Sequence, residues 1–169
     1  LHSMEKRRIL FVCLGNICRS PLGEGVLRHL AAQRGLSESL ETASAGTGGW
    51  HHGEPPDPRS IAVAGSHGVD IAAQRARQLL RDDFRNFDMI FAMDRANLRD
   101  IVRLAPQDSS ADIHLFLDFV GHTASDVPDP YYGDEAAFQA VFETIEQGCR
   151  RLLDTLYPQG TGQPPQRLA

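Results

Sequence analysis

The chain has 169 residues, 41% of them hydrophobic, and a formal net charge of −5 at pH 7. This length predicts one domain that buries a core without disulfides or structural metal. The acidic excess, with basic residues interleaved, disfavours a nucleic-acid or anionic-membrane surface, and no apolar run approaches the roughly 20 residues of a membrane span.

The ends of the chain are expected to lie outside this domain. Residues 1–3 precede Met4 and are interpreted as the remnant of an expression tag. Residues 158–169 are rich in proline, glycine and glutamine and are predicted to be a disordered tail, which leaves 4–157 as the domain. No signal peptide is recognised, and an odd number of cysteines is atypical of a secreted disulfide framework, so we expect a cytoplasmic protein.

The first half of the chain alternates strand and helix patterns. Ser20 is expected to cap the first helix and Pro21 to occupy its first position. Asp57 and Pro58 are expected to begin the second helix in the same way. The predicted order is a buried strand at 8–13, a helix ending near Gly35, a strand at 41–45, a glycine-rich loop at 46–53 and a helix at 58–66.

The second half continues this alternation. It is predicted to contain a short helical turn at 79–86, a buried strand at 88–93, a helix at 94–104, a strand at 112–116, a loop at 118–133 and a long helix over 138–156. Strands that alternate with helices predict an α/β fold with a mainly parallel sheet. Ligands of such sheets collect at the carboxyl ends of the strands, where the loop after residue 13 lies.

The loop from Cys13 to Ser20 has the composition of an oxyanion cradle. A turn from a strand into a helix directs several backbone N–H groups into one concavity, and the helix dipole adds partial positive charge. Gly15 and Asn16 tolerate the positive φ that such a loop needs, and the Arg19 guanidinium matches two oxygens of a phosphate. The sequence therefore predicts a binding site for a tetrahedral oxyanion.

A cysteine in such a cradle is predicted to be a nucleophile. The amides and Arg19 favour the thiolate of Cys13, and the hydroxyl of Ser20 is placed to donate to it. Asp129, held between Pro128 and Pro130, is the candidate acid that protonates an aryl leaving group. Tyr131 and Tyr132 follow it and are expected to line an aromatic slot, and this chemistry requires neither metal nor cofactor.

Five motifs resemble one known family, the low-molecular-weight protein tyrosine phosphatases, from Arg8 to about Tyr157. They are V-C-L-G-N-I-C-R-S-P at 12–21, T-A-S-A-G-T at 42–47, A-R-Q-L at 76–79, M-D-x-x-N-L at 93–98 and D-P-Y-Y-G at 129–133. The resemblance implies a three-layer αβα fold, with a four-stranded parallel sheet of order 2-1-3-4 and helices on both faces. It also implies hydrolysis of phosphotyrosine in proteins, and of small aryl phosphates, without metal.

The resemblance further implies roles for single residues. Cys13 is the nucleophile, Arg19 the phosphate clamp, and Asp129 the general acid and then base of a phosphocysteine mechanism. Ser44 and His67 join Asn16 and Ser20 in the supporting hydrogen-bond network, and Cys18 is a second thiol that traps Cys13 as a reversible disulfide. The residues of the substrate pocket are Leu14, Gly15, Asn16, Ile17, Cys18, Ser20, Trp50, Tyr131 and Tyr132.

Other residues with reactive side chains are assigned structural roles. Cys149 falls on the apolar stripe of the last helix and is expected in the core. His51 and His52 have no metal-ligand partners at suitable spacing and are interpreted as solvated loop residues. Asp94 and Asn97 are expected to cap their helix.

Three other functions remain open at this point. An arsenate reductase on the same fold needs further redox thiols, and residues 70–110 contain no cysteine. A phosphoarginine phosphatase of the same family is favoured by a small polar residue at position 17, where this chain has Ile17. A phosphate-binding module or phosphocarrier without hydrolytic activity would not need both Arg19 and Asp129.

Overall fold

The computed structural model describes residues 6–158. The predicted tag remnant at 1–3 and, apart from Pro158, the predicted tail at 158–169 lie outside the described residues. The elements are β1 (Arg7–Cys13), α1 (Arg19–Gln33), β2 (Leu40–Gly46), α2 (Pro58–Ser66), α3 (Asp83–Asn86), β3 (Met89–Ala92), α4 (Arg95–Leu104), β4 (Asp112–Leu115), α5 (Phe116–Phe119) and α6 (Glu135–Leu156). Between residues 6 and 158, no helix is both long and apolar enough to cross a membrane.

The four strands form one parallel sheet in the order β2-β1-β3-β4, which confirms the order that the family resemblance implied. The chain moves from β1 to the neighbour on one side and then crosses to β3 on the other. The carboxyl ends of β1 and β3 therefore lie side by side, where the connections diverge and leave a crevice. Cys13 ends β1, and Asp94 follows β3 at the same edge of the sheet.

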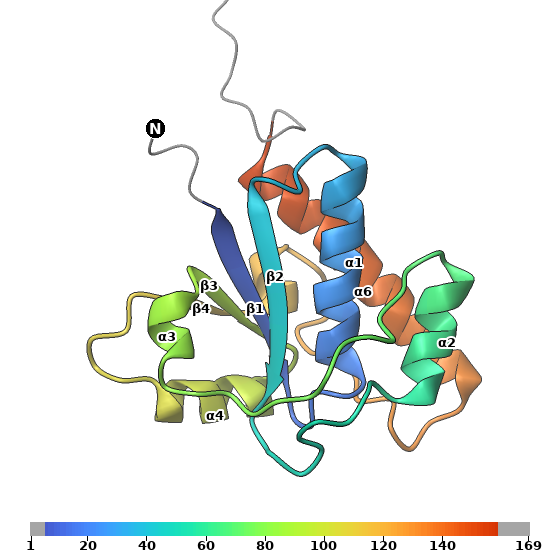
Figure 1. Cartoon of the computed structure of the whole chain (residues 1–169), viewed down its shortest axis with the longest axis horizontal. Helices are drawn as coiled ribbons and strands as arrows, with labels where there is room; N and C mark the ends of the chain where they lie inside the picture. Colours follow the sequence, from blue (N-terminus) through green and yellow to red (C-terminus); the bar gives the residue numbers. More distant parts are fainter. Residues whose placement is uncertain (1–5, 159–169) are drawn as a thin grey trace, which may run out of the picture.

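Helices cover both faces of the sheet (Figure 1). α1, α2 and α6 lie on one side and α3 and α4 lie on the other. The larger buried cluster, between the sheet and the helices α1 and α6, includes Phe11, Phe91 and Phe142. Because both faces of β1 are covered, Ile9, Leu10, Phe11 and Val12 are all fully buried. The central strand thus holds the loop that follows it on a rigid base.

Most predicted elements are confirmed within a few residues, including the Asp57 cap of α2 and the Asp94–Asn97 capping box of α4. Two predictions are wrong. The last strand was predicted to within one residue, but the short helix α5, which the sequence did not suggest, follows it at once, where the prediction had the end of the strand and the start of a loop. α1 begins at Arg19, and its N-cap position is Cys18, so Ser20 does not cap it. The Ser20 hydroxyl contacts the Cys13 thiol instead, at 3.0 Å.

Gly23 of α1 allows the helix to pack closely on β1. A Cβ atom at this position would lie 2.7 Å from two ring carbons of Phe11 and 2.9 Å from Cε of Met93. We expect Gly23→Ala to lower the free energy of unfolding by about 1–3 kcal/mol through overpacking. Gly65→Ala in α2 is the matched control, because its Cβ would meet no atom within 4 Å and should add up to about 1 kcal/mol of helix stability.

Urea denaturation of both variants measures this difference. Equal changes in Gly23→Ala and Gly65→Ala would contradict the close packing of α1 on the sheet.

Candidate active site

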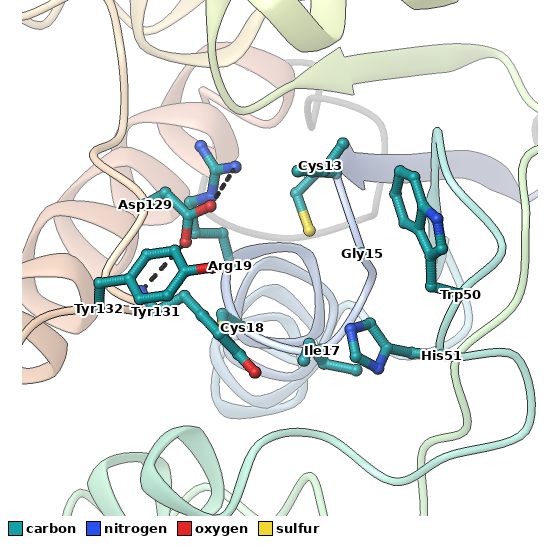
Figure 2. A pocket seen from close by; sticks show the side chains of 11 residues that line it. Cys13, Gly15, Ile17, Cys18, Arg19, Trp50, His51, Asp129, Tyr131 and Tyr132 are labelled. Carbon is teal, nitrogen blue, oxygen red and sulfur yellow. Dashed lines mark hydrogen bonds and ion pairs between the residues drawn. The ribbon is translucent and has the colours of Figure 1, made fainter.

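The loop between β1 and α1 places a thiol and a hydroxyl together at the edge of the sheet. Cys13 is 2% exposed, and its Sγ lies 3.0 Å from Oγ of Ser20 on the first turn of α1. Asn16, between them, has a φ of 58°, the left-handed conformation that a loop curling back on itself needs. The loop therefore curls back so that the thiol and the hydroxyl meet, and Figure 2 shows the sulfur of Cys13 pointing into the pocket.

The first turn of α1 is left available for an anion. Its N-cap position makes no side-chain capping bond, and the turn contains no acidic residue. The N–H groups of a helix start have no partner within the helix and carry partial positive charge. A helix that begins without a side-chain cap inside a cradle of amides is suited to bind a phosphate-sized oxyanion.

α2 turns two carbonyl groups of the loop outward. The backbone N–H of Asp57 donates to the Ile17 carbonyl at 2.8 Å, and the buried Ser60 hydroxyl donates to the Cys18 carbonyl at 3.2 Å. Fixing the carbonyls on α2 keeps negative partial charge away from the concave side of the loop. The sequence predicted Asp57 as a helix cap but gave no signal for these two contacts.

The guanidinium of Arg19 is buried and held by two acceptors. Its Nη1 donates to Oδ2 of Asp94 at 2.6 Å and to the carbonyl of Val127 at 2.9 Å. Burial works against the charge, but the negative charges of Cys13, Asp94 and Asp129 outweigh it and raise the pKa of Arg19. Asp94 thus has a second role that sequence reasoning missed, although its place directly after a strand of the same sheet was a usable signal.

Asp129 faces the same pocket from the loop that precedes α6. Its Oδ2 lies 3.6 Å from Nη2 of Arg19, and its Oδ1 accepts the backbone N–H of Tyr131 at 3.1 Å. Figure 2 shows Asp129, Tyr131 and Tyr132 on one side of the Cys13 sulfur and Trp50 and His51 on the other. A carboxyl group and aromatic walls therefore meet around one thiol.

The pocket around Cys13 encloses about 240 Å³. Tyr132 is 96% exposed and Trp50 is 71% exposed, so both stand at its rim. Most of the predicted pocket residues line it, whereas Asn16 and Ser20 lie behind the loop. The lining residues are Cys13, Leu14, Gly15, Ile17, Cys18, Arg19, Trp50, His51, Asp129, Tyr131 and Tyr132.

His51 corrects one sequence prediction. It was interpreted as a solvated loop residue, but its ring lines the pocket, and its Nδ1 lies 2.8 Å from Oε2 of Glu54. Gly15 and Asn16 were both noted as tolerating the positive φ that the loop needs, and in this loop Asn16 is the residue that adopts it. A Cβ at Gly15 would lie 3.0 Å from Cδ2 of His51, so a side chain there would press on this ring.

The supporting network contains three of the four predicted residues. Nδ2 of Asn16 donates to Oγ of Ser20 at 2.8 Å and to Oγ of Ser44 at 3.0 Å. His67 is placed elsewhere, at the end of α2, where its ring stacks on Phe142 at 4.2 Å and contacts the Gln139 amide. The family resemblance assigned His67 to the network, and the fold brings it to α6 instead.

The other two cysteines are held as neutral thiols. Burial and the neighbouring charges of Asp57, Cys13 and Asp129 raise the pKa of Cys18 to about 12. Burial also raises the pKa of Cys149, which is fully buried in the core as predicted. All three cysteines are free.

Comparison with known proteins gives one consistent result. The family model described as low molecular weight phosphotyrosine protein phosphatase matches residues 8–161. A relative of that name from Schizosaccharomyces pombe is 47% identical over 133 residues, which are 78% of this chain and 85% of the relative.

Solved structures agree in fold. A protein tyrosine phosphatase from Entamoeba histolytica, with Hepes in its active site, superposes with a TM-score of 0.85 at 37% identity and covers 91% of this chain and 99% of its own. An arginine phosphatase from Drosophila superposes with a TM-score of 0.83 at 32% identity and covers 88% of this chain and 97% of its own.

The Asp94–Arg19 pair predicts an asymmetry between two helix caps. Asp94 caps α4 and Asp134 caps α6, each accepting a backbone N–H three residues on, but only Asp94 also binds Arg19. Asn caps helices as well as Asp does, so Asp134→Asn should change the free energy of unfolding by less than about 0.5 kcal/mol. Asp94→Asn should lower the free energy of unfolding by about 1–3 kcal/mol, because a neutral amide replaces the charged partner of the buried Arg19 guanidinium.

Urea denaturation at neutral pH measures both variants. A loss in Asp94→Asn no larger than that in Asp134→Asn would show that the ion pair contributes nothing to stability.

Proposed function

Because the chain belongs to the low molecular weight phosphotyrosine protein phosphatase family, we propose that it hydrolyses phosphotyrosine in proteins through a phosphocysteine on Cys13. The observation that carries this proposal is the convergence of Cys13, Arg19 and Asp129 on one pocket. A nucleophile, an anion clamp and an acid are the groups that a phosphomonoester hydrolase needs.

In the first step, the Cys13 thiolate attacks phosphorus in line with the ester oxygen. The S–P bond forms as the P–O bond breaks, and Asp129 gives its proton to the departing phenolate oxygen. The products are a tyrosine side chain and a phosphocysteine. Ser20 is 3.0 Å from Sγ, which places its hydroxyl to stabilise the thiolate before attack.

In the second step, Asp129 acts as a base. Its carboxylate takes a proton from water, the water oxygen attacks phosphorus, and the S–P bond breaks. Inorganic phosphate is released, the Cys13 thiolate is regenerated, and Asp129 is again protonated. No metal or cofactor takes part in either step, because the amides of the loop and Arg19 carry the stabilisation of the phosphoryl charge.

The contacts of Arg19 suggest how it binds phosphate. Asp94 and Val127 already accept the two N–H groups of Nη1. The edge formed by Nε and Nη2 is left to bind two phosphoryl oxygens in the bidentate way that guanidinium groups favour. The same edge faces Asp129, so substrate oxygens and the acid meet at one place.

The walls of the pocket favour an aromatic substrate side chain. Tyr131 and Tyr132 pack edge to face with ring centroids 4.9 Å apart, and Arg59 lies over the Tyr131 ring at 5.6 Å. Aromatic rings bind another aromatic ring by stacking and edge contacts. We therefore propose a phosphotyrosine side chain on a protein as the partner, with Trp50 contacting its far face.

A second candidate, dephosphorylation of arginine, is motivated by the likeness to the arginine phosphatase. Ile17 argues against it, because a bulky aliphatic side chain in the pocket offers no hydrogen bond to a guanidinium group. Arsenate reduction lacks a relay thiol, since the remaining cysteine, Cys149, is fully buried on α6. A phosphocarrier function does not explain an acid beside the thiol.

Two further proposals concern the thiols. Cys18 lines the same pocket as Cys13, so a peroxide that oxidises Cys13 to a sulfenic acid sets up attack by the Cys18 sulfur, which forms a disulfide and releases water. The raised pKa of Cys18, about 12, makes this trapping slow.

We propose a cytoplasmic location because a catalytic thiol must stay reduced between turnovers.

The mechanism predicts that removing the nucleophile and removing the general acid lower turnover to different extents. With a phenyl phosphate ester in the presence of EDTA, Cys13→Ser should abolish turnover, and Asp129→Asn should lower kcat by about 10² to 10³. Asp126→Asn is the matched control: Asp126 lies in the same loop, but its carboxylate accepts the N–H of Arg95 and does not line the pocket. It should keep kcat within about twofold.

The wild-type pH profile of kcat/KM should be bell-shaped on the acidic side, because it requires a thiolate and a protonated acid together. A flat profile from pH 5 to 9, or full activity in Cys13→Ser, would refute the mechanism.

Matched phosphopeptides distinguish tyrosine from arginine as substrate. We expect kcat/KM for a phosphotyrosine peptide to exceed that for the phosphoarginine peptide of the same sequence by at least about 100-fold, because the aromatic walls and Ile17 suit only the former. Ile17→Thr should reduce the ratio of the two kcat/KM values, because its hydroxyl offers a hydrogen bond to the guanidinium group of phosphoarginine. A wild-type preference for phosphoarginine would support the second candidate.

A further inference from the structure

A chain of polar side chains runs from the Cys13 thiol to a carboxylate on the next turn of α1. Ser20 lies 3.0 Å from Sγ, and the amide of Asn16 bridges Ser20 and Ser44 at 2.8 and 3.0 Å. The hydroxyl of Ser44 then donates to Oε1 of Glu24 at 2.7 Å. Asn16, Ser20 and Ser44 are all buried, so every link counts toward satisfying a buried polar group.

Two contacts fix the polarity of this chain, one at Asn16 in its middle and one at Glu24 at its far end. The backbone N–H of Arg77 donates to Oδ1 of Asn16 at 3.0 Å, and an N–H cannot accept. This contact fixes which end of the Asn16 amide faces the two serines. At the far end, an ionised Glu24 carboxylate can only accept, so the Ser44 hydroxyl must be the donor of their hydrogen bond.

The polarity decides where the Ser20 hydrogen points. Because the Asn16 amide donates to Ser20, the Ser20 hydroxyl is left to donate elsewhere. Its acceptors are the Cys13 sulfur at 3.0 Å and the Ala45 carbonyl at 3.4 Å, and the sulfur contact is the closer. The thiolate therefore receives the hydrogen bond.

We propose that Glu24 is a positioning residue for Cys13, acting through Ser44 and Asn16 to keep the Ser20 hydroxyl donating to the thiolate. This inference rests on the proposed function, because it concerns the same nucleophile. If Glu24 is lost, the buried Ser44 hydroxyl lacks an acceptor. A 180° rotation of the Asn16 side-chain amide would then point its oxygen at Ser20 and Ser44, and only the hydrogen bond from the Arg77 N–H would be lost. In that arrangement Ser20 donates to Asn16 and not to sulfur.

Simple electrostatics predicts the opposite effect. A negative charge near a thiolate disfavours it, so removing Glu24 should make Cys13 more reactive if charge alone matters. The charges that face the sulfur are Arg19 and Asp129, and Glu24 itself is paired with Arg28 at 2.7 Å. A fall in Cys13 reactivity on removal of Glu24 therefore indicates positioning, and a rise indicates an effect of charge alone.

The test measures alkylation of Cys13 by iodoacetamide, in which the thiolate sulfur displaces iodide, by mass spectrometry of the Cys13 peptide at pH 6 and pH 9. Glu24→Met keeps the length of the side chain and removes the acceptor. It should lower the rate at pH 6 by about fivefold, the loss of part of one charge-assisted hydrogen bond, and change the rate at pH 9 much less. A rate at pH 6 equal to or above that of the wild type would overturn the proposal.

Two controls test the route. Arg28→Met removes the ion pair but leaves the contact of Glu24 with Ser44, and should react within about twofold of wild type. In a Ser44→Ala background, Glu24→Met should cause no further loss, because its effect passes through Ser44. An additional fivefold loss in that background would overturn the route.

Should Glu24→Met fail to fold, Glu24→Gln serves instead. Its single amide oxygen must serve both Ser44 and Arg28, so the rate at pH 6 should not exceed that of the wild type. A faster rate would overturn the proposal. Alkylation does not depend on turnover, so a wild-type protein inactive on aryl phosphates would refute the proposed function and leave this result interpretable.

Discussion

The site depends on the ion pair between Arg19 and Asp94, in which a guanidinium buried to 3% side-chain exposure meets a carboxylate oxygen at 2.6 Å. Asp94 caps α4 through the backbone N–H of Asn97, so the position of this carboxylate is fixed by a helix and by the strand before it. Arg19 is the first residue of α1, which packs against the same sheet. The clamp therefore has its geometry before any substrate arrives, and binding need not spend energy on ordering it.

The same preorganisation extends through the loop. The carbonyls of Ile17 and Cys18 are held outward by α2, and the first turn of α1 makes no side-chain cap. An uncapped helix start is ordinarily a loss of stability, and here it leaves donors directed at the place where a phosphoryl group binds. Stability given up at the helix end is thus converted into affinity for an anion.

Much of this was accessible from the sequence, for reasons that can be named. Buried apolar runs and Asp-Pro or Asp-x-x-Asn caps are local signals, and they predicted the strands of the sheet and the starts of α2 and α4. Cys13, Arg19 and Ser20 lie within eight residues, so their convergence also followed from local pattern.

What failed depended on contacts between distant segments. His67 was assigned to the network by resemblance but packs against α6 from the end of α2, and Ser20 was assigned a cap by its residue type. Gly15 was noted for its conformational freedom, whereas in the structure it leaves room for the ring of His51. No local pattern reveals that a histidine 36 positions after Gly15 closes on it, or that Asp94 reaches Arg19. Such pairs are fixed only when the sheet brings β1, β2 and β3 side by side.

The two walls of the pocket come from loops far apart in the sequence, one after β2 with Trp50 and His51, the other before α6 with Tyr131 and Tyr132. Neither loop supplies an amide of the cradle between Cys13 and Arg19. The wall before α6 also carries Asp129, whereas the loop after β2 carries none of Cys13, Arg19 and Asp129. Evolution and protein engineering can therefore alter the Trp50 wall, and with it the choice of target, while the bond-breaking machinery is inherited intact. On this side of the pocket, recognition of the target protein is separate from the chemistry of phosphoryl transfer.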